Sequence, residues 1–202
     1  GTPATVTLTH TGVNSLSVTG GTVHTNGKTL IDQAATAATT TGAISIPITG
    51  SGGLTKAGPG TLTLSGANSF TGLLVVAEGT LSTASWNSFS ANGPLGNSPG
   101  SVTLGGAATQ GTLQYTGPAS NSPGTLKGLT VGPGGGKIQL SFVGGSPGGQ
   151  YVHLNGSSLS GSGPLTVDTS HAGAMTSRFI LVGPSAFSGT ITVNAHSQLQ
   201  SN

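Results

Sequence analysis

Only three side chains in the 202-residue chain carry a carboxylate: Asp32, Glu78 and Asp168. Hydrolysis of a glycosidic bond needs two carboxylates on either side of that bond, and lyase chemistry uses carboxylates that bind calcium beside a base. The three acids are far apart in the sequence, and each has a different local setting. We therefore predict three solvated turn residues rather than a catalytic pair. The chain is not expected to be an enzyme or to hold a cofactor.

The five histidines are the remaining candidates for metal or acid–base chemistry. They show no metal-binding spacing, such as the i, i+4 pair of a zinc-binding helix. His24 and His153 each follow a valine on a comparable strand, so stacking of those strands could align them. We predict outward-facing polar positions and no metal site. The histidines are His10, His24, His153, His171 and His196.

Four aromatic residues could form a patch on which a sugar ring stacks: Trp86, Phe89, Tyr115 and Tyr151. The same side chains could instead anchor loops or fill the core. We favour the second interpretation.

Charged residues are scarce in this chain. It has five Lys or Arg and three Asp or Glu, for a net charge of +2, whereas about a quarter of a typical soluble domain is charged. The bases are scattered, and binding to phosphates requires clustered cations, so nucleic acid is excluded as a partner. The absence of cysteine excludes a disulfide scaffold. No apolar run approaches the roughly 20 residues of a membrane helix, so membrane insertion is not expected.

The elements that position these side chains are short strands. Runs such as 6–8, 44–46 and 61–64 alternate threonine or serine with aliphatic residues, which is the period of a half-buried strand. Turns rich in glycine, proline and asparagine separate them. The Ala-rich stretch 32–38 is interpreted as a loop. The sequence therefore predicts an all-β fold.

One stretch of the sequence occurs twice, at residues 50–81 and 161–199. In the alignment Leu54 falls on Leu165, Leu62 on Phe179, and Leu74 on Ile191. Self-similarity of short strands separated by turns is typical of a stacked, quasi-one-dimensional fold. We predict one domain over residues 1–202, with two cycles at about 6–81 and 102–199 joined by 82–101.

Residues 53–72 read GLTKAGPGTLTLSGANSFTG, and the segment ends in EGTL at 78–81. This stretch is similar to the autotransporter-associated β-strand repeat. The segments GPLG at 93–96, SVTL at 101–104 and GTLQY at 111–115 resemble what often follows that repeat. The resemblance implies a right-handed parallel β-helix that is exposed on, or secreted from, a bacterial surface.

In such a fold each coil lies about 4.8 Å from the coil before it, and inward side chains stack into ladders. At roughly 22 residues per coil the chain forms about nine coils. The predicted core ladder consists of Leu62, Leu64, Leu74, Val76 and Leu81 in the first copy, and of Phe179, Leu181, Ile191, Val193 and Leu199 in the second.

Neither end of the sequence carries a polar cap. The first strand begins at Thr5, Val6, Thr7 and Leu8, and the last ladder positions are Ile191, Val193 and Leu199. Uncapped ends of a solenoid expose strand edges, so one chain could continue into the next. Such a head-to-tail contact does not close, and it builds a filament. The rival explanation is that a longer passenger was cut at these positions.

The leading hypothesis is a non-enzymatic structural protein, located outside the cell or on its surface, whose partner is a further copy of itself. The alternative is a segment of an adhesin or autotransporter passenger that binds glycans or host surfaces. A polysaccharide-active enzyme would require two of the three carboxylates to meet in one groove.

Overall fold

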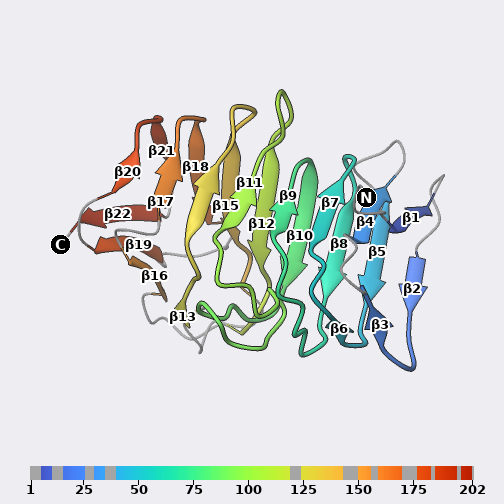
Figure 1. The fold of residues 1–202 in the computed structure, drawn as a ribbon. Coiled ribbons are helices and arrows are strands. Elements are labelled where there is room, and N and C mark those ends of the chain that lie inside the picture. The colour runs from blue at the N-terminus through green and yellow to red at the C-terminus, as the bar shows by residue number, and fades with distance from the viewer. Residues whose placement is uncertain are drawn as a thin grey trace.

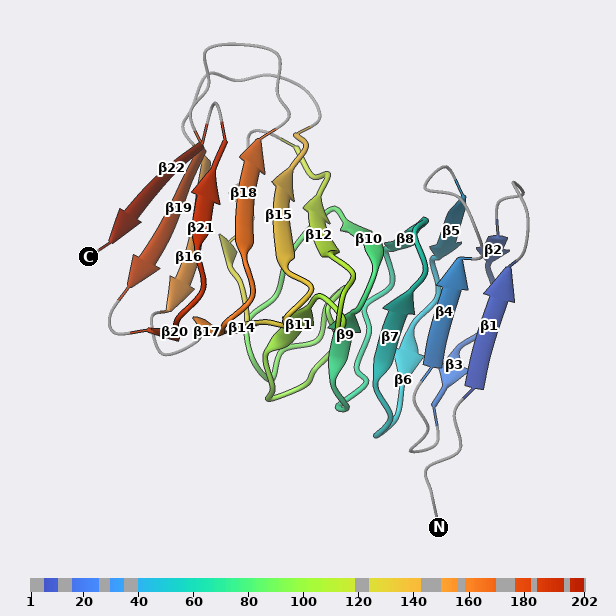
Figure 2. The same cartoon turned by 90° about the horizontal axis from the view of Figure 1, so that it is seen from above.

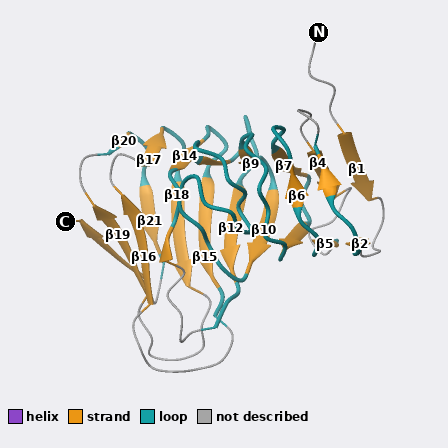
Figure 3. Ribbon diagram, turned by 60° about the horizontal axis from the view of Figure 1, so that its bottom comes forward, coloured by secondary structure: helices purple, strands orange, loops and turns teal. Residues whose placement is uncertain are grey.

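A computed structural model describes residues 6–10, 16–25, 30–34, 40–118, 124–142, 150–155, 159–169, 177–182, 185–194 and 197–201. These residues form β-strands joined by turns and loops, with no helix among them (Figure 3). The described part of the chain consequently holds no helix that could cross a membrane. Strands Leu30–Ala34 and Thr41–Ile44 show that the interpretation of 32–38 as a loop was wrong for residues 32–34.

Two long parallel sheets of eight strands each run the length of the molecule (Figure 1). The first sheet contains β1 (Val6–His10), β4 (Leu30–Ala34), β7 (Leu54–Ala57), β9 (Leu74–Val76), β11 (Val102–Leu104), β14 (Leu129–Val131), β17 (Leu159–Gly161) and β20 (Ala186–Phe187). The second sheet contains β2 (Leu16–Val18), β5 (Thr41–Ile44), β8 (Thr61–Leu64), β10 (Gly79–Thr83), β12 (Gly111–Tyr115), β15 (Gly136–Leu140), β18 (Leu165–Thr169) and β21 (Ile191–Val193).

The remaining strands form two shorter parallel sheets. One pairs β3 (Val23–His24) with β6 (Ile48–Thr49). The other contains β13 (Gly124–Thr125), β16 (Gln150–Asn155), β19 (Ser177–Val182) and β22 (Ser197–Ser201). Every strand pair in the described residues joins one coil to the next, so the fold is a parallel β-solenoid, seen from above in Figure 2.

The described strands make eight coils, because each long sheet has eight strands. The prediction was about nine. The difference arises because coil length varies. Thr61 pairs with Thr80, an interval of 19 residues, whereas Gly79 pairs with Gly111, an interval of 32. Long loops at the corners therefore lengthen the average coil beyond the predicted value.

The core consists of inward side chains that stack from coil to coil. In the first sheet one row contains Leu54, Leu74, Val102, Leu129 and Leu159, and in the second sheet another contains Leu62, Leu81, Leu113, Ile138 and Val167. All ten side chains are buried. Strand residues alternate between the two faces of a sheet, so the threonines between them point outward. Burial of each such aliphatic side chain contributes about 1.5–3 kcal/mol.

The residues expected in the core ladder differ in exposure between the two copies. Leu62, Leu64, Leu74, Val76, Leu81 and Phe179 are buried, while Leu181, Ile191 and Val193 are half-buried. Leu199 is 42% exposed, although its register partner Phe179 is only 1% exposed. The difference follows from position, since β21 and β22 are terminal strands of their sheets.

The two similar segments of the sequence do not occupy equivalent positions. Leu54 lies in the first sheet and its aligned partner Leu165 in the second. Leu74 likewise lies in the first sheet, and its aligned partner Ile191 lies in the second. The similarity therefore reflects a shared strand–turn–strand pattern that fits more than one face. The division into two cycles stays a prediction.

Replacement of one central rung tests the contribution of the ladder. Leu81→Ala removes a fully buried side chain from β10, and it should lower the free energy of unfolding by about 2–5 kcal/mol. Leu73→Ala is the matched control, because that side chain is 60% exposed; its effect should stay within about 0.5 kcal/mol. Urea denaturation measures both, and equal effects would contradict the ladder.

Candidate functional site

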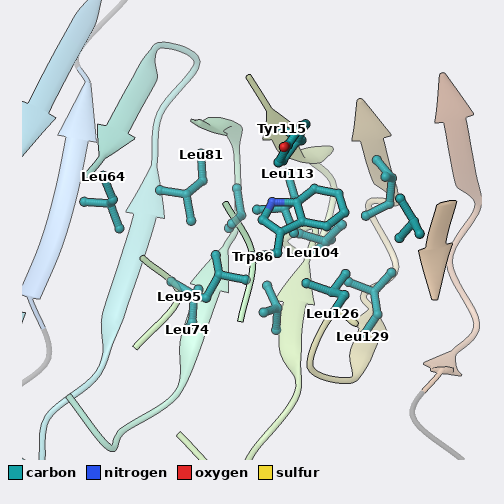
Figure 4. Close-up of a cluster of buried hydrophobic side chains, with 14 of the residues drawn as sticks. Leu64, Leu74, Leu81, Trp86, Leu95, Leu104, Leu113, Tyr115, Leu126 and Leu129 are labelled. Atoms are coloured by element: carbon teal, nitrogen blue, oxygen red, sulfur yellow. The ribbon is translucent and has the colours of Figure 1, made fainter. Parts of the chain in front are cut away.

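The longest connection between described strands is the segment 84–101, here called the 84–101 loop, which joins β10 to β11. It lies within residues 82–101, the segment predicted from the sequence to connect the two cycles. The green segment in Figure 1 lies between the short sheet β3–β6 and strand β13. The loop is packed onto the core, because Trp86 and Leu95 are buried. Figure 4 shows the Trp86 indole among the leucines of the neighbouring coils.

Asn87 organises the loop from within. Its Nδ2 donates hydrogen bonds to the carbonyl oxygens of Ala91, at 2.7 Å, and Gly96, at 2.8 Å. Its Oδ1 accepts a hydrogen bond of 2.9 Å from the Leu95 amide. A Cβ at Gly93 would lie 2.6 Å from that Oδ1, so a larger residue would displace the side chain. One amide side chain thus closes the turn that spans residues 91–96.

The coil on one side of the loop anchors it through Asn68, which is buried. The Asn68 Nδ2 donates to the Pro94 carbonyl at 2.9 Å, and its Oδ1 accepts from the Ile48 amide at 2.9 Å. The backbone adds a bond of 2.8 Å from the Asn97 amide to the Phe70 carbonyl. The loop is therefore fixed to the coil that precedes it.

Lys127 anchors the loop from the other side. Its side chain is 0% exposed, and Nζ donates to the carbonyl oxygens of Gly96 at 2.8 Å and Ser98 at 3.4 Å. The Lys127 amide also donates to the Asn87 carbonyl at 3.2 Å. Burial lowers the pKa of the Lys127 amine from its ordinary value of 10.5 to about 8. A buried cation thus serves carbonyl groups that water cannot reach.

A second buried lysine plays a similar part at another corner. Lys56 lies in β7 at a rung paired with Val76, and Nζ donates to the carbonyl oxygens of Gly58, at 2.7 Å, and Ala57, at 3.1 Å. From the sequence, both lysines were expected to be scattered bases with no role in the core. For Lys56 a signal existed, because Leu54-Thr55-Lys56 places it two residues after an inward leucine. No comparable pattern marks Lys127.

The outer part of the 84–101 loop carries exposed residues. Phe89 is 39% exposed, and the next residue, Ser90, has a φ of 53°. Among the described non-glycine residues Ser90 is the only one with a positive φ, a conformation that costs about 1 kcal/mol or more. Asn97 Nδ2 donates a hydrogen bond of 2.8 Å to Asn92 Oδ1. These residues form a small surface, which we call the loop face.

The aromatic residues weighed as a sugar-stacking patch do not form one on the described surface. Trp86 is 7% exposed and Tyr115 is 1% exposed. Their rings meet edge to face at 5.7 Å, and Tyr115 meets Phe142 in the same way at 5.5 Å. Trp86 and Tyr115 are therefore core residues, as the favoured interpretation expected, and Phe89 alone is exposed. The side chain of Tyr151 lies outside the described residues.

The structure does not bring Glu78 and Asp168 together. Glu78 precedes β10, while Asp168 lies in β18, three coils away, a separation of about 14 Å along the stack. Asp168 forms an ion pair with Lys137, whose Nζ is 2.7 Å from Oδ2. Asp32 belongs to β4, and its side chain lies outside the described residues.

The histidines are likewise dispersed. His24 lies in β3, where Nδ1 is 2.7 Å from the Thr49 hydroxyl, and His153 lies in β16 of a different sheet. The two are therefore not aligned as stacking could have arranged. No group of three potential metal ligands occurs among the residues that the structure describes. His171, His196 and the side chain of His10 lie outside that part.

The lowered pKa of Lys127 predicts how stability depends on pH. Between about pH 8 and pH 10.5 the unfolded chain holds a proton that the folded chain has lost, so the free energy of unfolding rises with pH. The rise should reach about 1–2 kcal/mol between about pH 8 and pH 9.5. Burial raises the pKa of the Tyr115 hydroxyl, which acts in the opposite direction at higher pH. Urea denaturation at a series of pH values measures the profile.

Lys127→Met should remove this rise, because the variant has no amine to titrate. Lys137→Met is the control, since that lysine lies on the outer face of β15, and it should keep the rise. Parallel profiles for the wild type and Lys127→Met would contradict the assignment.

Comparison with known proteins places this solenoid among bacterial surface proteins. Residues 54–82 match the family model described as Passenger-associated-transport-repeat. The chain is 36% identical over 149 residues to the "Adhesin BmaC autotransporter" of Brucella suis biovar 1 (strain 1330). That match covers 71% of this chain but only 4% of the relative. No solved structure matches the chain.

The matched repeat begins at β7 and ends within β10, so it includes the buried rungs Leu54, Leu62, Leu74 and Leu81. The family match and the fold agree with the resemblance seen in residues 53–81. The chain thus carries a passenger-associated-transport-repeat and is similar to part of an autotransporter adhesin, and proteins with this repeat are exposed on the bacterial surface or secreted.

Proposed function

We propose that this chain is a stiff, non-catalytic segment of a surface adhesin, a rod whose corners hold binding loops away from the cell. The observation that carries the proposal is the continuous parallel pairing of eight coils, with rows of buried rungs that run from β7 to β17 and from β8 to β18. A passenger repeat at 54–82 and a relative named as an adhesin support it. Since the chain spans 4% of that relative, its role within a longer protein belongs to the proposal.

Stiffness follows from the direction of the hydrogen bonds. In a parallel solenoid the backbone bonds run along the rod and join each coil to the next, so bending must open several bonds together. Eight coils at about 4.8 Å give a rod of roughly 34 Å. Corners tolerate insertions, as the interval of 32 residues between Gly79 and Gly111 illustrates. Loops can therefore be added without disturbing the ladders.

Attachment of coated beads to cells tests the adhesive role. Beads that carry the folded chain should adhere to epithelial monolayers several-fold more than beads coated with serum albumin. Equal attachment of the two kinds of bead would contradict the proposal. Release of reducing ends from polysaccharides incubated with the chain would contradict its non-catalytic character.

A second candidate role is head-to-tail assembly of further copies on the last coil. It is favoured by the exposure of Leu199, together with the half-buried Ile191 and Val193. At the opposite end Val6, Thr7 and Leu8 belong to β1, the terminal strand of the first sheet; Thr5 lies outside the described residues. A second copy that adds strands at this edge would bury the open rungs.

A charge at the open rung tests this assembly. Leu199→Lys should abolish polymers, because a lysine there would be buried between two copies. Sedimentation velocity should show wild-type polymers that grow with concentration and a variant that stays monomeric. Leu73→Lys, an equal change at an exposed position far from the end, is the control. A wild type that is monomeric at every concentration would contradict end-to-end assembly.

A further inference from the structure

We propose that the loop face is a binding site for neutral carbohydrate, with Phe89 as the stacking surface and Asn92 and Asn97 as hydrogen-bonding groups. This inference rests on the proposed adhesive function and names its ligand class and location.

Phe89 is the exposed aromatic side chain of this loop. Among the described residues three large hydrophobic side chains are exposed, namely Leu73, Phe89 and Leu199. Contacts place Leu73, and the residue that follows Phe89, beside residues 98–100. A Cβ at Gly100 would be 3.0 Å from Leu73 Cδ2, and the Ser90 amide donates to the Ser98 carbonyl at 3.4 Å. Phe89 therefore offers an exposed aromatic face on a loop that is fixed to the core, which is the surface that a stacking ligand needs.

The loop face is preorganised. Asn87 and Lys127 fix the turn from below, and they share the Gly96 carbonyl as an acceptor. Ser90 holds a strained φ directly after Phe89, so the ring is presented by a backbone conformation that the surroundings impose. Strain of this kind persists where the neighbouring structure enforces it, and it clusters at functional sites. A loop backbone that is already fixed loses little conformational freedom when a ligand binds.

The asparagine pair supplies the polar groups. Asn97 Nδ2 donates to Asn92 Oδ1, which leaves the Asn92 amide N–H groups and the Asn97 carbonyl oxygen for a ligand. Asn92 is exposed, and Asn97 is half-buried. A donor and an acceptor side by side match two adjacent sugar hydroxyls, because each hydroxyl both donates and accepts. An aromatic ring packs against the C–H face of a sugar in the same way as against other apolar groups.

The charge distribution selects a ligand without formal charge. No Asp, Glu, Lys or Arg occurs between Glu78 and Lys127 in the sequence, and Lys127 is buried. A sulfated or uronic acid polymer would find no cation here, and a basic peptide would find no anion. One aromatic ring and one amide pair also suit one or two sugar rings, whereas a stable protein interface uses about 20–30 residues a side.

The test measures binding of the purified chain to defined oligosaccharides by calorimetry. The probes are hexamers of β-1,4-glucose, β-1,3-glucose, β-1,4-N-acetylglucosamine and α-mannose, with heparin and polygalacturonate as anionic probes. At least one neutral hexamer should bind, and Phe89→Ala should weaken that binding about tenfold or more. Binding of the anionic probes alone, or of no probe, would overturn the proposal.

Matched variants separate stacking from general apolar docking. Phe89→Trp should keep the affinity, since it retains an aromatic face, whereas Phe89→Leu should lose it despite its similar hydrophobicity. Leu199→Ala, which removes an exposed apolar side chain elsewhere, should bind like the wild type. Fluorescence of Trp86, the single tryptophan of the chain, verifies that the loop stays folded in the variants without a new tryptophan, and the urea-denaturation midpoint verifies it for Phe89→Trp. A Phe89→Leu variant that binds the oligosaccharide like the wild type would show that stacking on an aromatic ring is not required, and it would overturn the proposal.

The bead assay distinguishes failure of this site from failure of the adhesive role. Wild-type and Phe89→Ala beads that adhere equally well would remove the carbohydrate site and leave the adhesive role intact. If wild-type beads do not adhere, the adhesive role itself fails.

Discussion

The stacking of each coil on the next, through parallel backbone bonds and inward aliphatic rungs, is the interaction on which the rest of the structure depends. With eight charged residues in 202, the chain has few ion pairs to contribute. Threonine alternates with the inward rungs along the strands, and it suits the outer face because its branched Cβ favours the strand conformation. Where the stack stops, as at β22, the same side chains become exposed.

The corners are the least favourable part of such a stack, because closely packed turns bury backbone carbonyl groups that then need hydrogen-bond donors other than water. Glycine allows the close approach: Gly79 has a φ of +71°, and a Cβ there would lie 2.4 Å from the Gly58 carbonyl oxygen. The amines of Lys56 and Lys127 then supply donors to the carbonyls that remain. Half of the four lysines in the chain thus serve the interior, which leaves the outer surface nearly neutral.

The coils differ most in structure on the third face of the solenoid, which is the face that carries the two short sheets. There the sheets β3–β6 and β13–β22 are separated by coils that carry loops instead of strands. The 84–101 loop shows how a loop can be elaborated while the two long sheets continue beneath it. Asn68 and Lys127 attach it to the coils on either side, so it acts as a rigid part of the rod. A surface adhesin needs this combination, in which binding groups vary while the scaffold does not.

The sequence by itself determined the strands and their inward residues, because alternation along a strand is a local property that Leu62 and Leu64 display directly. Composition and the 53–81 segment also indicated a stacked parallel fold of a surface protein. The tertiary structure decided which sheet each strand joins, because the number of residues in each corner loop determines where the next strand begins. For this reason Leu54 and Leu165 lie in different sheets although they align. Tertiary packing likewise buried Lys127 and Trp86 while exposing Phe89, because burial depends on contacts between coils that no local pattern records.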